Sequence, residues 1–384
     1  MTDAVRLGFV GLGGIARRHA GNAVAAGHDV AGADVAAGPR ETFADEFDAP
    51  TFDDHAALLE AGVDAVVVTT PNSVHAPPAV AALDRDVPVL VEKPLADDLA
   101  AAERIADAAR ESAAFCAVGF QHRFAPAVEL FDVARRDGRL GDVRGVTAEY
   151  VRRRGIPSLG SWFTDRERAG GGALVDIGVH ALDAALFCLG FPEVLEVSGT
   201  TRALFGGRED YADPEGWTRM RGETGSTEFD VEDGATAFVR CAGGRTLVLE
   251  AAWAADRPPG SSVRVQGTAA GATFDLLADG GPLVLRDAAA GVGARDHYRD
   301  QTLDAAGSID RRAALIERFC GAVADASGDV TAETDQATRG DANVTATGRD
   351  RRGRLATVEE GLTVQRVLDA VYRSAEAGRA VEPR

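Results

Sequence analysis

The chain has 384 residues, 45% of them hydrophobic, and it carries 60 acidic against 41 basic residues, a formal net charge of −19. This length predicts two domains, and the charge argues against nucleic acid and anionic membranes as partners. Acidity with a single lysine also suggests a halophilic protein that stays soluble in high salt, although GC-rich coding would give the same composition.

The cysteines and the N-terminal residues indicate the cellular compartment that we expect for the protein. The four cysteines are scattered in apolar stretches without a paired spacing, which predicts free thiols in a cytoplasmic protein. The N-terminal stretch is broken by glycines and followed by Arg17, Arg18 and His19, so no signal peptide is expected. The sequence contains no run of about 18 apolar residues, so no transmembrane helix is expected.

The first third of the chain alternates strands with helices. An apolar strand at residues 5–10 is followed at once by the turn "GLGGIA", a helix through residue 26 and a second strand at 28–34. The remaining predicted strands are 64–70, 87–92 and 113–120, and the helices between them are 71–83 and 99–111. This order is typical of a parallel sheet in a Rossmann domain.

The glycine turn fits a dinucleotide. Gly11, Gly13 and Ala16 match the G-x-G-x-x-[GA] fingerprint in its strand–turn–helix context. Gly11 permits the tight turn, and Gly13 lets a pyrophosphate approach the backbone. The helix then begins at Gly14 and Ile15, whose N–H groups are free for the phosphates. NAD is therefore the expected cofactor.

Cofactor choice depends on Asp34, at the end of the second strand. Its carboxylate would bind the ribose hydroxyls and repel a 2′-phosphate, which favours NAD over NADP. Arg40 could soften this preference and admit NADP, or it could be a solvated helix residue. Thr70, Glu92 and Lys93 also follow strands, at the edge where ligands bind in such sheets.

Lys93 is the only lysine in the chain, and arginine fills every other basic position. A lysine can handle a proton, whereas arginine remains charged at neutral pH. GC-rich coding reduces the number of lysines, and a single remaining lysine could lie at any position by chance. Its place on the ligand-binding edge favours a chemical reason.

After residue 122 the pattern changes to alternating strands. A helix is expected at 126–136, and the predicted strands are 143–152, 194–201, 235–240, 246–253, 262–267 and 272–277. They suggest a large, open, mostly antiparallel sheet. Polar loops are expected over 202–234 and 325–354, and a final helix at 357–377 should dock on the body. We therefore expect a Rossmann domain at 1–122 and an α/β domain for substrate binding and oligomerisation at 123–384.

A polar face lies on the helix predicted after the glycine run at 170–172. Asp176, His180 and Asp183 are spaced i, i+4 and i+7, so they share one side of an otherwise apolar helix. Three interpretations remain: a surface ion-pair set, a metal site, or an acid/base site. No cysteine or further histidine obviously joins, so a metal is not expected. In an acid/base site, His180 transfers the proton. Asp176 then fixes the tautomer of His180 or holds a substrate hydroxyl.

The segment before this helix offers substrate contacts. The arginine run 152–154, with Arg153 at its centre, could grip polar groups of a substrate, and Trp162 could cover the apolar face of a sugar ring. A solvated strand end and a packed tryptophan would explain the same residues.

Several motifs together resemble a known family. "GFVGLGGIA", "VVVTTPNSVHAPPAVAAL", "VLVEKPLA", "GFQHRF", "GGGALVDIGVHALD" and "VYRSAEAGRAVE" occur in this order along nearly the whole chain. They resemble the glucose–fructose oxidoreductase, inositol dehydrogenase and rhizopine-catabolism (Gfo/Idh/MocA) family. The resemblance implies NAD(P)-dependent oxidation or reduction of a secondary alcohol on a sugar, polyol or related ring, in homodimers or homotetramers.

The resemblance also implies roles for single residues. Lys93 and His180 would be the catalytic pair and would touch the substrate, with Asp176 holding both substrate and His180; Asp183 would support them. The residues implied to line the cofactor are Asn72, Glu92 and Arg123, with His75 at the nicotinamide end. Two alternatives stay open: an NAD-dependent glycoside-cleaving enzyme on the same fold, and a non-enzymatic NAD-binding regulator.

Overall fold

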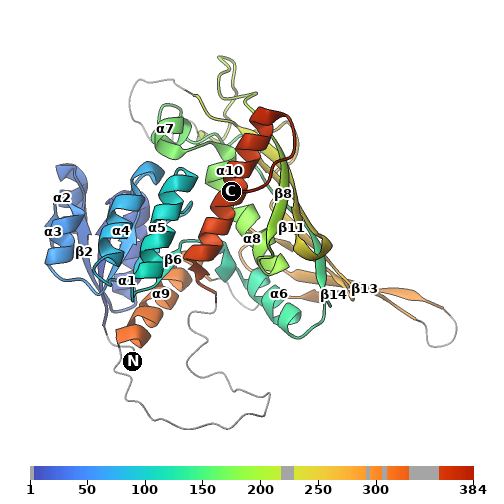
Figure 1. The fold of residues 1–384 in the computed structure, drawn as a ribbon, viewed down its shortest axis with the longest axis horizontal. Helices are drawn as coiled ribbons and strands as arrows, with labels where there is room; N and C mark the ends of the chain where they lie inside the picture. Colours follow the sequence, from blue (N-terminus) through green and yellow to red (C-terminus); the bar gives the residue numbers. More distant parts are fainter. Residues whose placement is uncertain (1–3, 218–228, 291–294, 305–308, 328–353) are drawn as a thin grey trace, which may run out of the picture.

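The computed structural model describes residues 4–217, 229–290, 295–304, 309–327 and 354–384. They form two sheets with helices packed around and between them (Figure 1). The loop expected at 325–354 lies mostly outside the described residues, as does the middle of the one expected at 202–234; residues 325–327 still belong to a helix.

The first sheet is the predicted Rossmann sheet. Its strand order is β15-β6-β5-β4-β1-β2-β3, and all neighbours are parallel except β15, which runs antiparallel to β6. The strands are β1 (Arg6–Val10), β2 (Asp29–Ala33), β3 (Thr51–Phe52), β4 (Ala65–Val68), β5 (Val89–Val91), β6 (Cys116–Val118) and β15 (Ala356–Thr357). Strands β4, β5 and β6 are buried along their whole length, which is why they read as unbroken apolar runs.

Helices cover both faces of this sheet. They are α1 (Gly14–Ala25), α2 (Ala37–Phe47), α3 (His55–Glu60), α4 (Ala76–Leu83), α5 (Leu99–Glu111) and, from the C-terminal part of the chain, α9 (Arg311–Ser327). Helix α9 packs against α1 and shares its apolar core. The sequence did not predict α2, α3, α9, β3 or β15. The domain boundary at residue 122 stays a prediction, and α9 and β15 show that later segments also contact the first sheet.

The second sheet has the order β14-β13-β12-β11-β7-β10-β9-β8 and is antiparallel except for the pair β7–β10. This confirms the open, mostly antiparallel sheet. Its strands are β7 (Val143–Val151), β8 (Val194–Arg202), β9 (Gly234–Cys241), β10 (Arg245–Ala252), β11 (Ser262–Gly267), β12 (Gly271–Asp275), β13 (Leu283–Ala289) and β14 (His297–Leu303). Helices α6 (Pro126–Arg136), α8 (Val179–Leu189) and α10 (Val358–Ala377) lie on one side of it (Figure 1).

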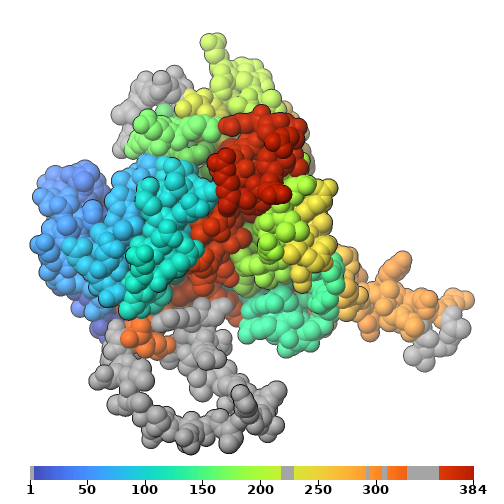
Figure 2. All heavy atoms as spheres, viewed as in Figure 1, coloured from blue at the N-terminus to red at the C-terminus, as the bar shows by residue number. Residues whose placement is uncertain are grey.

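The hairpin β13–β14 was not predicted, and it projects from the body (Figures 1 and 2). Strand β14 is almost entirely exposed, so its sequence carries no apolar alternation. Cross-strand ion pairs join Arg286 to Asp300 and Asp287 to Arg299. Side-chain pairs of this kind stabilise a ribbon without burying apolar surface, so hydrophobic patterning could not find it.

The C-terminal helix docks as expected. Helix α10 packs on β8 and α5, so it lies between the two sheets, as the space-filling view also shows (Figure 2). It begins with a capping box in which Thr357 and Glu360 bond each other's backbone N–H groups, and it ends at Gly378 in the left-handed conformation.

The apolar helix that carries the polar face departs from the prediction in its first part. A short helix, α7 (Arg166–Ala169), precedes a π-helical turn at Leu174–Gly178, and only then does α8 begin. The stretch Arg166–Leu189 is long and apolar enough to cross a membrane by length and composition, but its most apolar window is 94% buried within the protein. It is a core helix.

Candidate active site

A cavity of about 600 Å³ lies between the two sheets, at the carboxyl ends of β1, β2, β4 and β5 and beside the start of α8. Most of the predicted site residues line it. They are Gly11, Gly13, Gly14, Ile15, Asp34, Thr70, Asn72, His75, Glu92, Lys93, Trp162, Asp176 and His180. Arg40, Arg123 and Arg153 do not line this cavity.

The glycine turn leaves room for a ligand at one end of the cavity. Gly11 has φ = +86°, and a Cβ there would meet the backbone of Thr70 at 2.8 Å. Gly13 is the N-cap residue of α1 and supplies no side-chain cap, and a Cβ on Gly13 or Gly14 would enter open space. Uncapped N–H groups beside open space form a cradle for phosphate, so these residues fit a dinucleotide pyrophosphate.

Asp34 faces the cavity and is held by the turn itself. Its two carboxylate oxygens accept hydrogen bonds from the backbone N–H groups of Leu12, at 2.8 Å, and Ala36, at 2.9 Å. Arg40 donates to the backbone carbonyl oxygen of Asp34 at 2.6 Å instead of pointing into the cavity. Asp34 therefore lines the cavity, and Arg40 does not.

The middle of the cavity wall is buried and polar. Glu92 Oε1 lies 2.7 Å from His19 Nε2, and the Oγ1 of Thr70 is buried without a hydrogen-bond partner among the described residues. Burial acts to raise the pKa of Glu92, but the bond from His19 and the charge of Lys93 lower it overall. Asn72 donates to the carbonyl oxygen of Ala169 at 2.8 Å, which ties α7 to this wall.

His75 lines the same wall and is buried. Its Nδ1 lies 3.0 Å from the carbonyl oxygen of Pro94, and its Nε2 lies 3.0 Å from that of Thr70. Burial lowers the pKa of His75 despite these carbonyl contacts, so the ring is neutral. A neutral imidazole has one N–H and can donate to only one of the two oxygens.

Lys93 and Asp176 meet across the two parts of the chain. Lys93 Nζ donates to Asp176 Oδ1 at 3.0 Å and to the backbone carbonyl oxygen of Asp176 at 2.8 Å. Trp253 Nε1 donates to the other carboxylate oxygen at 2.9 Å. Burial acts to raise the pKa of Asp176, but the charges of Lys93 and Arg152 and the bond from Trp253 lower it. The carboxylate is therefore ionised and fixed.

Buried contacts hold the π-helical turn that contains Asp176. Buried Glu232 accepts hydrogen bonds from the N–H groups of Gly172 and Leu174 and from the hydroxyl of Tyr372. A Cβ on Gly172 would lie 2.0 Å from the carbonyl oxygen of Glu232, so only glycine fits this approach. These contacts hold the wide turn at the entry to α8.

His180 is a buried, neutral imidazole at the cavity wall. It is 6% exposed, and its Nδ1 has no hydrogen-bond partner among the described residues. Burial lowers its pKa well below the ordinary value, and the neighbouring His122, Lys93, Arg312 and Arg152 lower it further. A neutral ring beside the Lys93–Asp176 pair can accept a proton.

His122 packs against His180 and was missed as a site residue. The two rings are perpendicular, with centroids 4.5 Å apart. Its Nδ1 lies 2.9 Å from Arg311 Nη1, and burial together with the charge of Arg311 lowers the pKa of His122 to about 3. The residue belongs to the motif "GFQHRF", which is the signal in the sequence that could have found it.

Trp162 and Phe163 also line the cavity, and their stacked rings have centroids 4.0 Å apart. Of the arginine run 152–154, Arg152 lines this cavity, whereas Arg153 and Arg154 line only a neighbouring pocket, which Arg152 also lines. Neighbouring residues of an extended segment point to opposite sides, and the sequence could not say which side faced the cavity. Arg152 donates to Gly155 and stacks over Trp217.

Arg123 and Asp183 form a structural pair instead of lining the cavity. Both side chains are 2% exposed, and Arg123 reaches both carboxylate oxygens of Asp183, with a shortest distance of 2.5 Å. It also donates to Glu360. Burial acts to lower the pKa of Arg123, but the two carboxylates raise it above its ordinary value. Asp183 thus faces the core, and the expected common face of three residues reduces to Asp176 and His180.

Trp253 and Arg312 complete what sequence reasoning missed. Trp253 closes a predicted strand, so its position gave no hint of the bond to Asp176. Arg312 lies in the first turn of α9, a helix that the sequence did not predict. Within the described ranges, no cluster of three or more His, Cys, Asp or Glu side chains has the arrangement of a metal site.

Comparisons with known proteins identify the family of the chain. Residues 5–120 match the family described as "Oxidoreductase family, NAD-binding Rossmann fold", and residues 133–273 match the "GFO/IDH/MocA C-terminal domain". D-glucoside 3-dehydrogenase of Escherichia coli is 34% identical over 58% of this chain. The match covers 62% of the length of that relative, which is less than two thirds.

Two further proteins match along most of the chain. D-xylose 1-dehydrogenase (NADP(+)) 2 of Haloferax volcanii is 30% identical over 88% of this chain and 87% of its own length. The crystal structure of an oxidoreductase domain protein from Kribbella flavida superposes with a TM-score of 0.77, at 26% identity, over 100% of both chains.

Proposed function

The chain belongs to the GFO/IDH/MocA oxidoreductase family, and on this premise we propose that it interconverts a secondary alcohol and a carbonyl group on a sugar, polyol or related cyclic substrate with NAD(P). The observation that carries this proposal is the meeting of Lys93, Asp176 and His180 in the cavity that also contains the glycine turn. The domains at 1–122 and 123–384 would supply the cofactor and substrate sides.

The cofactor would lie along the first-sheet side of the cavity. The cradle at Gly13 and Gly14 fits its pyrophosphate, Asp34 fits the adenosine ribose, and the hydroxyl of Thr70, which has no partner among the described residues, fits a polar group of the ligand. When bound, the nicotinamide accepts or supplies the hydride. Asp34 favours NAD over NADP.

The residues of the chain would handle the proton and the oxygen of the substrate. His180, neutral and buried, accepts the hydroxyl proton during oxidation. Two of the three N–H groups of the Lys93 ammonium donate hydrogen bonds to Asp176. The third N–H group can donate to the substrate oxygen as negative charge develops there. Asp176, fixed by Lys93 and Trp253, keeps this donor in place.

The far end of the cavity would bind the rest of the substrate. Trp162 and Phe163 offer aromatic surface for the apolar face of a ring. Arg152, in place of Arg153, offers guanidinium donors for hydroxyl or acidic groups; its described hydrogen bonds go to neutral oxygens. These features favour a cyclic polyhydroxy substrate.

A substrate screen tests the function. Sugars and polyols are incubated with the chain and NAD or NADP, and absorbance of the reduced cofactor is followed. Net formation of reduced cofactor with at least one substrate is expected. Tight NAD binding without net NADH release, together with cleavage of a glycoside, would favour the glycoside-cleaving alternative. Cofactor binding without turnover of any substrate would favour the regulator.

Cellular setting and assembly complete the proposal. The four cysteines are free and buried, which supports a reducing, cytoplasmic setting. The second sheet has helices on one side, and its strands alternate buried and exposed residues, which supports homodimers or homotetramers formed through the other side. The net charge of −19 supports a halophilic enzyme, and activity that does not rise with added salt would contradict this.

A further inference from the structure

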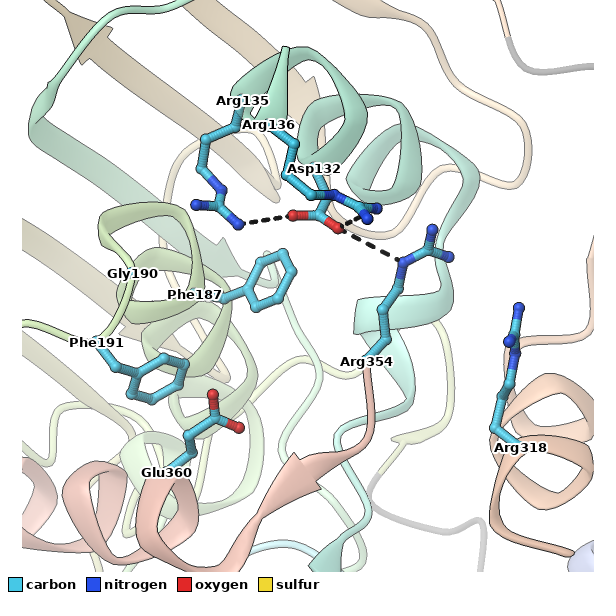
Figure 3. Close-up of a pocket in the computed structure, with 9 residues that line it drawn as sticks. All are labelled: Asp132, Arg135, Arg136, Phe187, Gly190, Phe191, Arg318, Arg354 and Glu360. Carbon is cyan, nitrogen blue, oxygen red and sulfur yellow. Dashed lines mark hydrogen bonds and ion pairs between the residues drawn. The ribbon is translucent and has the colours of Figure 1, made fainter. Parts of the chain in front are cut away.

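A second cleft, of about 390 Å³, lies away from the candidate active site and shares none of its lining residues. It is bounded by α6, the end of α8, the start of α10 and α9 (Figure 3). Four arginines line it: Arg135, Arg136, Arg318 and Arg354. Such a gathering of cations is notable in a chain with a net charge of −19.

One buried carboxylate organises three of these arginines. Asp132, whose side chain is 8% exposed, bonds Arg135 Nη2 and Arg136 Nη2 at 2.8 Å each, and Arg354 Nε lies 3.8 Å from it. Figure 3 shows the guanidinium groups of Arg135 and Arg136 converging on Asp132 from α6, with Arg354 approaching from the chain before β15. A single carboxylate fixes the three groups without neutralising them.

Positive charge remains in the cleft. Arg354 pairs with Glu129 as well as with Asp132, whereas Arg318 has no hydrogen-bond or ion-pair partner within the described ranges. Four guanidinium groups therefore face two directly contacting carboxylates. Arg136 and Arg318 are exposed, so their N–H groups can reach an anion in the cleft.

The other acid of the cleft is engaged elsewhere. Glu360 accepts hydrogen bonds from Arg123 and from the backbone N–H of Thr357, where it completes the cap of α10. Phe187 and Phe191 add two aromatic rings to the lining of the cleft (Figure 3). The cleft thus combines guanidinium groups with aromatic surface.

We propose that this cleft binds the phosphate group of a small phosphorylated metabolite. Guanidinium forks match the oxygens of phosphate in a bidentate manner and remain charged at every physiological pH. The phenyl rings lie where they can contact the carbon part of such a ligand. The overall negative charge argues against nucleic acid and anionic membranes as the source of the phosphate.

The cleft is separate from the proposed reaction. Phe187 and His180 belong to the same helix but lie seven residues apart, roughly 10 Å along its axis. Binding in the cleft can therefore be measured while cofactor occupies the other cavity. The inference holds or fails independently of which alcohol the enzyme oxidises.

Calorimetric titration of inorganic phosphate into the full chain, with NADH in excess and ionic strength held constant with NaCl, tests the proposal. Excess NADH blocks phosphate at the start of α1. The double variant Arg136→Gln/Arg318→Gln removes two exposed guanidinium groups, and Arg104→Gln, an exposed arginine of α5 outside the cleft, is the matched control. We expect affinity to fall at least about 10-fold in the double variant and to stay unchanged in the control.

Phenyl phosphate is the second probe. It should bind more tightly than inorganic phosphate because its ring can contact Phe187 and Phe191. Equal phosphate affinity in the wild type and the double variant would overturn the proposal. So would no binding by the wild type at about 10 mM phosphate, tenfold above the 1 mM range of weak binding. Thermal unfolding of each variant in the same NaCl buffer, without phosphate, checks that the variant is folded. Arg318→Gln alone, at a residue with no ion-pair partner among those described, serves as the second variant and should still weaken binding.

Discussion

The ammonium nitrogen of Lys93 lies 3.0 Å from a carboxylate oxygen of Asp176 and 2.8 Å from the backbone carbonyl oxygen of the same residue. Lys93 follows β5 of the first sheet, and Asp176 lies in the π-helical turn before α8, 83 residues later. The pair therefore joins the cofactor side of the cavity to the substrate side. Lys93 is also the only lysine of the chain.

Replacing Lys93 with arginine tests whether lysine itself is required. Arginine keeps the charge, but its planar fork is larger and points its donors differently. We expect kcat to fall at least about 100-fold with little change in NADH affinity. Steady-state kinetics and a fluorescence titration of NADH measure the two effects.

Lys93→Met controls for steric damage in the same experiment. Methionine is nearly isosteric with lysine but neutral, so this variant should be as inactive as Lys93→Arg. Near-normal turnover of Lys93→Arg would mean that the position needs only a positive charge.

Removing His180 tests proton acceptance. His180→Ala should lower kcat by about 10²–10⁴-fold, while NADH still binds because the glycine turn and Asp34 lie on the other side of the cavity. The measurement is kcat beside the dissociation constant of NADH. Loss of cofactor binding, or full activity, would contradict the assignment.

The pH dependence follows from the depressed pKa of His180. Burial and nearby positive charge hold that pKa well below the ordinary value, so the ring stays neutral as pH falls through about 6.5. The kcat/KM for alcohol oxidation should therefore show no loss between about pH 8 and pH 6. A profile that keeps rising through alkaline pH would instead assign proton acceptance to Lys93.

The pH–activity profile needs a control for loss of folding stability at low pH. His122 is neutral in the folded protein, with its pKa lowered to about 3, but binds protons in the unfolded chain below about 6.5. Its contribution to stability is thus present above the unfolded pKa and is lost as pH falls toward the folded one. Near-ultraviolet circular dichroism at each pH separates unfolding from loss of chemistry.

Cofactor preference tests Asp34. A 2′-phosphate placed beside this fixed carboxylate should cost roughly 10–100-fold in kcat/KM. We expect NAD to be preferred and the preference to narrow in Asp34→Ser. Arg40→Gln should change the ratio little, because Arg40 donates to the backbone of Asp34 and does not line the cavity. A clear preference for NADP would make Arg40 the phosphate ligand.

Arg123 offers a test between structural support and cofactor contact. Arg123→Met would leave Asp183 buried without its bidentate partner, which costs about 3–5 kcal/mol of unfolding free energy. Denaturant unfolding should show this loss, and NADH affinity measured well below the transition should be unchanged. An undiminished stability with weakened NADH binding would restore the role that the family resemblance implied.

Local sequence patterns determined the Rossmann sheet and most of the second sheet. Continuous apolar runs at β4 and β5 and alternating runs at β7 and β9 each record which faces are buried, so these strands can be located from residue type and spacing alone. The same patterns missed α9, whose apolar side is complete only against α1, and β14, which is exposed along its length.

The site divides in the same way. The sequence alone determined the glycine turn, Asp34, Lys93 and the spacing of Asp176 and His180, because each depends on residue type and local spacing. Only the tertiary structure decided that Arg152 lines the cavity and that Arg123 pairs with Asp183. The direction of a side chain depends on segments distant in sequence that compete for it, and a buried arginine goes where a carboxylate can offset its desolvation cost.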